Sequence, residues 1–128
     1  MGKMISVNAG DGSGSFAAYL ALPSSGKGPG VVIGQEIFGI NANMREVADF
    51  YAEEGYVALV PDLFWRLEPG VELGYTEADF ARAIELFQGL DGDKAVPDID
   101  ATFNALRAMP EVEASGLGYV GFCMGGKL

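Results

Sequence analysis

The sequence has 128 residues, of which 49% are hydrophobic, and 18 acidic against 8 basic residues give a net charge of -10. This composition is typical of a soluble globular protein, and the negative charge disfavours binding to nucleic acid or to an anionic membrane. No apolar run is long enough to cross a membrane, and the first residues lack the apolar core of a signal peptide, so we expect a cytoplasmic protein with one domain, residues 1–128. The single cysteine, which cannot form an internal disulfide, agrees with a reducing compartment.

The first third of the chain has the pattern of strands. Residues 4–7 and 15–21 are β-prone runs on either side of the turn-rich residues 8–14, which predicts an antiparallel hairpin. After a loop rich in glycine and proline, residues 31–33 form a short, wholly apolar run. Such a run is typical of a central strand that is covered on both faces.

A helix and a second buried strand follow. Apolar residues recur at helical spacing between Met44 and Tyr51, and Gly55 provides a C-terminal stop. Residues 56–60 are again a continuous apolar run, which Pro61 closes. This order of elements, a strand, a helix and another buried strand, is typical of parallel pairing.

Two helices and a strand complete the pattern. Thr76 is a plausible N-cap for a helix that ends near Gly89, and a second helix is predicted to begin near Pro97 and to end before Pro110. Residues 117–122 form the last strand. The sequence therefore predicts an α/β fold with a mainly parallel sheet, helices on both faces and an antiparallel N-terminal hairpin at one edge.

The end of the chain contains three overlapping glycine patterns. Residues 116–121 match a dinucleotide-binding fingerprint, but they are themselves the predicted strand and not a strand-to-helix turn. Residues 121–127 match a phosphate-binding loop, but Leu128 stands where a serine or threonine would hold Mg²⁺. Residues 121–125 match a nucleophile elbow, G-x-S-x-G, with Cys123 in place of the serine. We favour the elbow, because its crowded turn requires small residues on both sides of the nucleophile and glycines stand there.

Four separated segments together indicate a family. They are residues 35–39 (Gln-Glu-Ile-Phe-Gly), 41–46 (Asn-Ala-Asn-Met-Arg-Glu), 61–64 (Pro-Asp-Leu-Phe) and 121–126 (Gly-Phe-Cys-Met-Gly-Gly). With these motifs in this order, the sequence resembles the dienelactone hydrolase family over essentially its whole length. The resemblance implies an α/β-hydrolase fold that opens enol-lactone rings with a Cys-His-Asp triad and a glutamate that contacts the cysteine. It implies neither a metal nor a cofactor, and its ligand is a small-molecule ester or lactone.

The resemblance also assigns roles to residues. Cys123 would be the nucleophile and Glu36 the glutamate that helps to generate its thiolate. The backbone N–H groups of Ile37 and Met124 would form the oxyanion hole, and Phe38 would line the substrate pocket. The residues alone leave other interpretations open: a small buried hydrophobe for the cysteine, an exposed loop carboxylate for the glutamate, and a hydrophobic staple onto the next helix for the phenylalanine.

The substrate side departs from the family's pattern. Relatives that act on the anionic dienelactone hold its carboxylate with arginines, one of them on the helix that is expected here from about residue 76 to 90. Our alignment places Phe80 at that position and Arg82, the candidate substrate-binding cation, about 200° further round the helix. Ile84 and Phe87 stand where the family often has aromatic pocket residues. The sequence therefore leaves open a substrate other than the dienelactone.

The sequence contains no histidine. In the family the triad histidine and aspartate lie downstream of the elbow, so we expect the isolated chain to be an inactive N-terminal portion of such a hydrolase. Residues 117–122, a central strand in the family's fold, would then form an open apolar edge that pairs with a complementary C-terminal chain or with a second copy, as in a symmetric homodimer. The alternative function is a non-catalytic α/β module that self-assembles through this edge.

Overall fold

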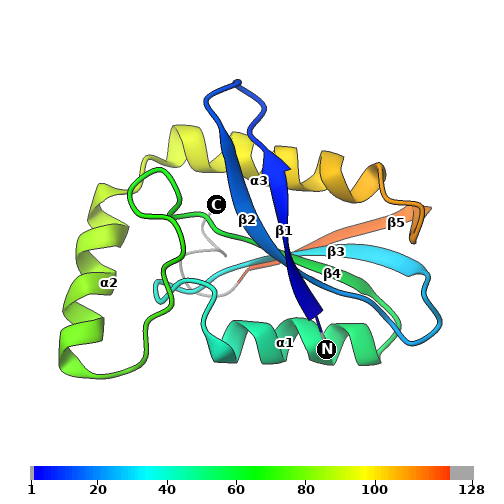
Figure 1. The fold of residues 1–128 in the computed structure, drawn as a ribbon, viewed down its shortest axis with the longest axis horizontal. Helices are drawn as coiled ribbons and strands as arrows, with labels where there is room; N and C mark the ends of the chain where they lie inside the picture. The colour runs from blue at the N-terminus through cyan, green and yellow to red at the C-terminus, as the bar shows by residue number, and fades with distance from the viewer. Residues whose placement is uncertain (1, 122–128) are drawn as a thin grey trace.

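The computed structural model describes residues 2–121, except the side chains of residues 114–116. Its elements are, in chain order, β1 (Gly2–Asn8), β2 (Ser15–Ala21), β3 (Gly28–Gly34), α1 (Ala42–Glu53), β4 (Val57–Pro61), α2 (Glu77–Gly89), α3 (Gly92–Arg107) and β5 (Val112–Gly121) (Figure 1). The predicted hairpin, the buried strands and the first two helices are confirmed. Cys123 and Met124 lie outside the described residues.

The strands form one mixed sheet in the order β1-β2-β4-β3-β5. β1 pairs with β2 and β2 with β4 in antiparallel fashion, whereas β3 is parallel to both of its neighbours, β4 and β5. Helix α1 packs on one face and α3 on the other, and α2 lies beyond one end of the sheet (Figure 1). The predicted α/β architecture is therefore confirmed, and β5 is at an edge of the sheet within the described part of the chain.

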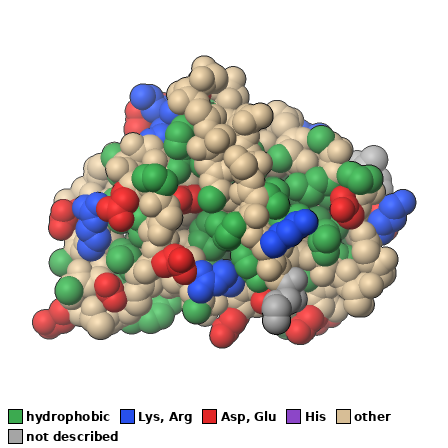
Figure 2. Space-filling model, viewed as in Figure 1, with side chains coloured by type: hydrophobic (Ala, Val, Ile, Leu, Met, Phe, Trp, Pro, Cys, Tyr) green, Lys and Arg blue, Asp and Glu red, His purple; other side chains and the backbone are tan. Residues whose placement is uncertain are grey.

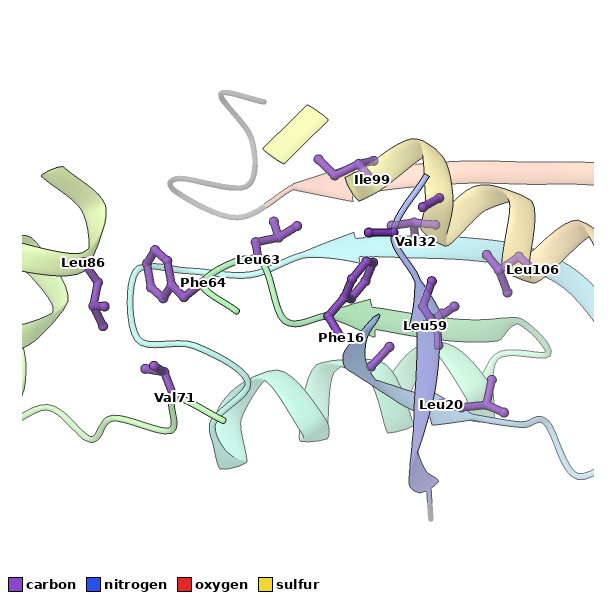
Figure 3. Packing of buried hydrophobic residues seen from close by; sticks show 14 of the residues in the cluster. Phe16, Leu20, Val32, Leu59, Leu63, Phe64, Val71, Leu86, Ile99 and Leu106 are labelled. Atoms are coloured by element: carbon purple, nitrogen blue, oxygen red, sulfur yellow. The ribbon is translucent and has the colours of Figure 1, made fainter. Parts of the chain in front are cut away.

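The core is divided by the sheet into two clusters. Successive residues of β3 alternate between them: Val32 belongs to the cluster on the α3 side, whereas Val31 and Ile33 belong to the cluster on the α1 side. The first cluster extends along the sheet from Leu106 on α3 to Leu86 on α2 (Figure 3). This alternation explains why the sequence of β3 is a continuous apolar run.

Two element boundaries differ from the prediction. Helix α3 begins at Gly92, because the Asp91 side chain caps it by accepting the N–H of Asp93, so that Pro97 lies inside the helix and removes one backbone hydrogen bond. Strand β5 begins at Val112, before an irregularity in its pairing with β3. In both cases the element starts earlier than the local sequence pattern indicates.

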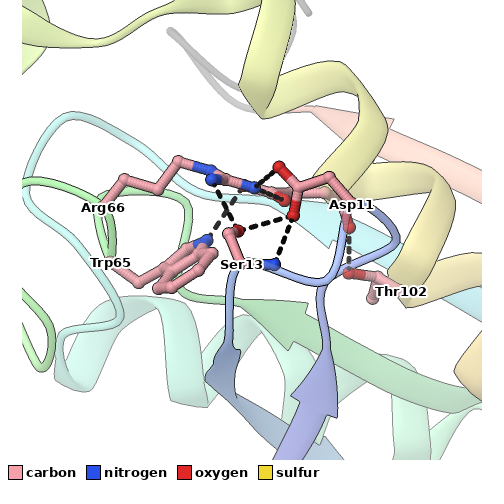
Figure 4. A network of polar contacts seen from close by, with 6 residues as sticks. Asp11, Ser13, Trp65, Arg66 and Thr102 are labelled. Atoms are coloured by element: carbon pink, nitrogen blue, oxygen red, sulfur yellow. Dashed lines mark hydrogen bonds and ion pairs between the residues drawn. The ribbon is translucent and has the colours of Figure 1, made fainter.

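A polar cluster ties the β1–β2 turn to α3. The Asp98 carboxylate, which is 1% exposed, accepts from Trp65 Nε1 at 2.9 Å and from Nε and Nη2 of Arg66 at 3.0 and 2.9 Å. The same guanidinium donates to Ser13 Oγ at 2.9 Å and to Asp11 Oδ2 at 3.2 Å (Figure 4). Four of its members, Ser13, Trp65, Arg66 and Asp98, line a pocket of about 390 Å³. The arginine there already donates four hydrogen bonds to protein acceptors.

The surface is mixed in charge. On the face shown in Figure 2, acidic and basic side chains are scattered among hydrophobic ones and form no basic patch. No helix in the described part of the chain is both long and apolar enough to cross a membrane.

Candidate active site

The loop that follows β3 begins with a fully buried amide. Gln35 is 0% exposed, and its Oε1 accepts the backbone N–H of Leu63 at 2.9 Å. Its Nε2 donates to the carbonyl oxygen of Glu36 at 3.2 Å. The amide therefore joins the loop after β3 to the loop after β4, and it fixes the backbone on which the two candidate residues at positions 36 and 37 lie.

Glu36 and Ile37 lie at the carboxyl end of β3, where α/β folds place their ligands. The Glu36 side chain is half-buried and its Oε1 accepts from Asn43 Nδ2, on the first turn of α1, at 3.4 Å. The Ile37 side chain is buried in the core cluster on the α3 side. Ile37 thus anchors the loop in the core, while Glu36 presents its carboxylate at the end of β3.

Gly39 lets the loop contact a distant segment. Its φ of +78° is in the left-handed region, and a Cβ at this position would lie 2.1 Å from the carbonyl oxygen of Val71. Gly39 forms a bridge with Glu72, and the N–H of Leu73 donates to the carbonyl oxygen of Phe38 at 2.9 Å. This close approach brings residues 71–75 alongside the candidate catalytic loop.

Asn41 holds the same two segments together. It caps α1 by accepting the N–H of Met44 at 3.1 Å, while its Nδ2 donates to the carbonyl oxygen of Leu73 at 2.9 Å and to the Tyr75 hydroxyl at 3.3 Å. The side chain is 5% exposed. One buried amide therefore sets both the start of α1 and the position of Tyr75.

Asp62 performs a similar role after β4. The carboxylate is 2% exposed and accepts the N–H groups of Phe64 at 3.2 Å and Gly70 at 2.8 Å. Burial raises the pKa of this carboxyl, although the two backbone hydrogen bonds oppose the shift. Asp62, part of the motif at residues 61–64, thus shapes the loop that leads to the site.

Phe38 lies in an aromatic pocket. Its ring centroid is 4.8 Å from that of Tyr75, in an edge-to-face arrangement, and 6.4 Å from that of Phe80. With Thr76 and Glu77 these rings line a pocket of about 390 Å³. The sequence pattern indicates Phe80 only as a departure from an arginine, and it gives no sign of Tyr75 except the position of this residue next to the N-cap of α2.

Arg82 does not line this pocket. Its guanidinium forms ion pairs with Glu68, in the loop before α2, and with Glu85 of the same helix, and its side chain is 42% exposed. Hydrogen bonds to Glu68 are the main reason why the Arg82 pKa is raised. Among the described candidate residues, Glu36, Ile37 and Phe38 lie together in the loop after β3. Arg82 instead pairs with acidic residues outside the pocket.

The ends of β3 and β5 lie side by side. In the parallel pairing of these strands Gly34 is opposite Gly121, so both strands end at the same side of the sheet. Glu36 follows the first of these glycines by two residues and Cys123 follows the second by two residues. Glu36 is among the described residues, whereas Cys123 is not, and only the strand that precedes it is described.

Comparison with known proteins identifies the family. The sequence profile of the dienelactone hydrolase family matches residues 16–128. The chain belongs to this family. A carboxymethylenebutenolidase of a Pseudomonas species is 42% identical over 118 residues, which are 91% of this chain and 49% of that protein. A carboxymethylenebutenolidase of Pseudomonas putida is 38% identical over 125 residues, 97% of this chain and 52% of that protein. The chain thus spans about half the length of these two dienelactone hydrolase relatives.

A solved structure agrees. The dienelactone hydrolase-like promiscuous phosphotriesterase from metagenomic libraries superposes with a TM-score of 0.71 at 28% sequence identity, covering 98% of this chain and 51% of that one. The match confirms that this member of the dienelactone hydrolase family has half of an α/β-hydrolase fold.

Proposed function

We propose that this chain supplies the nucleophile and oxyanion hole of a hydrolase that acts on small esters or lactones. Cys123 is the nucleophile and Glu36 is the carboxylate that accepts the thiol proton. The observation that carries the proposal is the register of β3 and β5. Gly34, two residues before Glu36, is opposite Gly121, two residues before Cys123. A free thiol has a pKa of about 8.5 and is mostly protonated at neutral pH, so it needs a neighbouring base.

In the first step the thiol proton passes to Glu36 and the cysteine sulfur bonds to the substrate's carbonyl carbon. The bond from that carbon to the alkoxy oxygen breaks, and Glu36 returns the proton to this oxygen, so that the alcohol leaves, or remains attached if the substrate is a lactone. Water then cleaves the thioester to give the carboxylic acid and the free thiol. The backbone N–H groups of Ile37 and Met124 donate to the carbonyl oxygen while it carries negative charge.

The 128 residues contain no histidine that could assist the attack of water. We therefore expect Cys123 of the isolated chain to be acylated without catalytic turnover. The chain spans about half the length of its relatives, so we propose that the remaining groups come from the other half of the fold, which would pair with the outer edge of β5. The edge is apolar and no strand of the described residues lies on that side. The alternative partner at this edge is a second copy of the chain. Such a dimer would be the self-assembling, non-catalytic α/β module that is the alternative function.

The test is the release of p-nitrophenol from p-nitrophenyl acetate by the purified chain. We expect one equivalent to be released in a burst, with acetyl mass added at Cys123, and no release from Cys123→Ala. Glu36→Gln should slow the burst by about 10²-fold, the usual range for loss of a general base. Glu46→Gln, which removes an exposed carboxylate of α1, is the control and should leave the rate unchanged.

The outcomes separate the hypotheses. Turnover that survives Cys123→Ala would contradict the assigned nucleophile. A native chain that is never acylated would favour the non-catalytic module. Native mass spectrometry distinguishes the partners, since a second copy gives twice the mass, and a monodisperse monomer at micromolar concentration would count against self-association.

A further inference from the structure

The pocket next to the proposed catalytic loop is aromatic, and none of the described residues in its wall is a cation. Its described lining consists of Phe38, Tyr75, Thr76, Glu77 and Phe80. Tyr75 and Phe80 are 64% and 51% exposed, although such large rings are usually covered. Phe38 follows Glu36 by two residues, so the pocket is adjacent to the place where the acyl group would react. The one charged side chain among these described lining residues is that of Glu77, which repels anions.

The N-terminus of α2 borders this pocket and would attract an anion if it were free. It is already compensated by the protein. Thr76 Oγ1 accepts the N–H of Asp79 at 3.1 Å, and the Asp79 carboxylate accepts the N–H of Gly74 at 3.0 Å. Together with Glu77, these groups place two negative charges on the first turn of the helix. A carboxylate in the pocket would therefore meet like charges.

Two arginines of α1 and α2, the helices that follow the two pocket segments, are also engaged. Arg82 pairs with Glu68 and Glu85, and Arg45 pairs with Glu72 and donates to the carbonyl oxygen of Ile40 at 2.9 Å. Neither arginine is part of the pocket lining. Recruitment of either to an anionic ligand would first break an existing ion pair.

We infer that this pocket binds an uncharged aromatic group of the substrate, so that the substrate is an aromatic ester or lactone without a carboxylate. That the bound molecule is an ester or lactone rests on the proposed function, whereas binding of an aromatic group in this pocket does not. A cavity of roughly 150 Å³ can hold benzene, so a pocket of about 390 Å³ leaves room for a ring and an ester group. Edge-to-face contacts with Phe38 and Phe80 would orient the ring.

Binding is measured by NMR titration of the 128-residue chain with two ketones that cannot be hydrolysed, acetophenone and 4-acetylbenzoate. They differ only in a carboxylate. At low salt we expect acetophenone to bind about two- to fivefold more tightly, the range of one partly exposed charge interaction. Glu77→Gln should tighten the binding of 4-acetylbenzoate alone, and Phe80→Arg should reverse the preference.

Phe50→Arg is the matched control, because it adds the same charge at an exposed aromatic residue of α1. It should leave both affinities unchanged. Phe80→Ala, which adds no charge, should weaken the binding of acetophenone. The inference is overturned if the native chain binds 4-acetylbenzoate as tightly as acetophenone, or binds neither. The NMR titration requires no turnover, so it still tests the pocket if the esterase burst is not observed. Conversely, a failure to bind either ketone would not contradict the assignment of Cys123 as the nucleophile.

Discussion

Removal of Arg66 should destabilise the fold more than neutralisation of its partner Asp98. The carboxylate is 1% exposed and the guanidinium is 21% exposed. Arg66→Met leaves a buried carboxylate whose one remaining side-chain donor among the described residues is Trp65 Nε1. Loss of one partner of a buried ion pair costs about 3–5 kcal/mol. The substitution also removes the cation–π contact of the guanidinium with the Trp65 ring, 4.5 Å away, which adds about 0.5–1 kcal/mol.

Asp98→Asn leaves a less costly defect. Arg66 keeps its bonds to Ser13 and Asp11, and water reaches the part of it that is exposed. The carboxamide oxygen that replaces the carboxylate can still accept from Trp65 Nε1. We therefore expect a loss of about 1.5–3 kcal/mol, the range for a hydrogen bond to a charged group.

Urea unfolding measures the free energy of unfolding that each of the two variants loses. The transition is followed by the fluorescence of Trp65, the single tryptophan, which lies in the same polar cluster. Arg107→Met is the control, since this arginine is exposed on the last turn of α3. Its loss should stay within about 1 kcal/mol, because it removes only an exposed cation–π contact with Phe103 and a hydrogen bond to Asn104. If Asp98→Asn costs as much as Arg66→Met, unequal burial does not control the energetics of this pair and the reasoning fails.

Three further predictions concern the turn and the loops. Hydrogen bonds from Ser13 lower the pKa of Asp11 from 3.8 to about 2, so Ser13→Ala should raise it in a ¹³C NMR titration; an unchanged pKa would contradict this. Because the folded-state pKa is the lower one, the stability from this carboxylate is present above pH 4 and is lost as the pH falls towards about 2. Gly39→Ala should lower the free energy of unfolding by more than about 2 kcal/mol, because the left-handed φ and the clash with Val71 act together; a urea midpoint like that of the native chain would refute the strain. Gln35→Leu should cost about 1–3 kcal/mol in the same assay, since it leaves a buried N–H without its acceptor, and a loss near zero would mean that the loops relax.

The parallel core was predictable because its signal is local. The strands β3 and β4 are buried on both faces, so each is a continuous apolar run whose length and closing residue can be recognised in the sequence. The N-cap of α2 was also local, since Thr76 is followed by two acidic residues in the first turn. Burial and capping at short range therefore account for most of the correct prediction of the fold.

The errors arose where another capping residue or a distant strand contact outweighed the local preference. Pro97 suggested a helix start, but Asp91 caps α3 earlier and the helix tolerates one missing hydrogen bond. The first residue of β5, Val112, pairs with Gly28 of β3 across an irregular register, which no periodicity in the sequence reveals. In the site, the motif at residues 35–39 indicated the loop but not its partners at residues 71–75.

The missed part of the site links catalysis to specificity. Phe38 contributes its ring to the aromatic pocket, and its carbonyl oxygen accepts the N–H of Leu73 at 2.9 Å. Asn41 extends the same connection from the cap of α1 to Tyr75. The loop that carries Glu36 and the segment that carries an aromatic ring are thus fixed to each other by backbone and amide hydrogen bonds. A substitution that moves the segment should therefore change the position of the carboxylate as well as the affinity for the substrate, so that specificity and rate at this site cannot be altered independently through this loop.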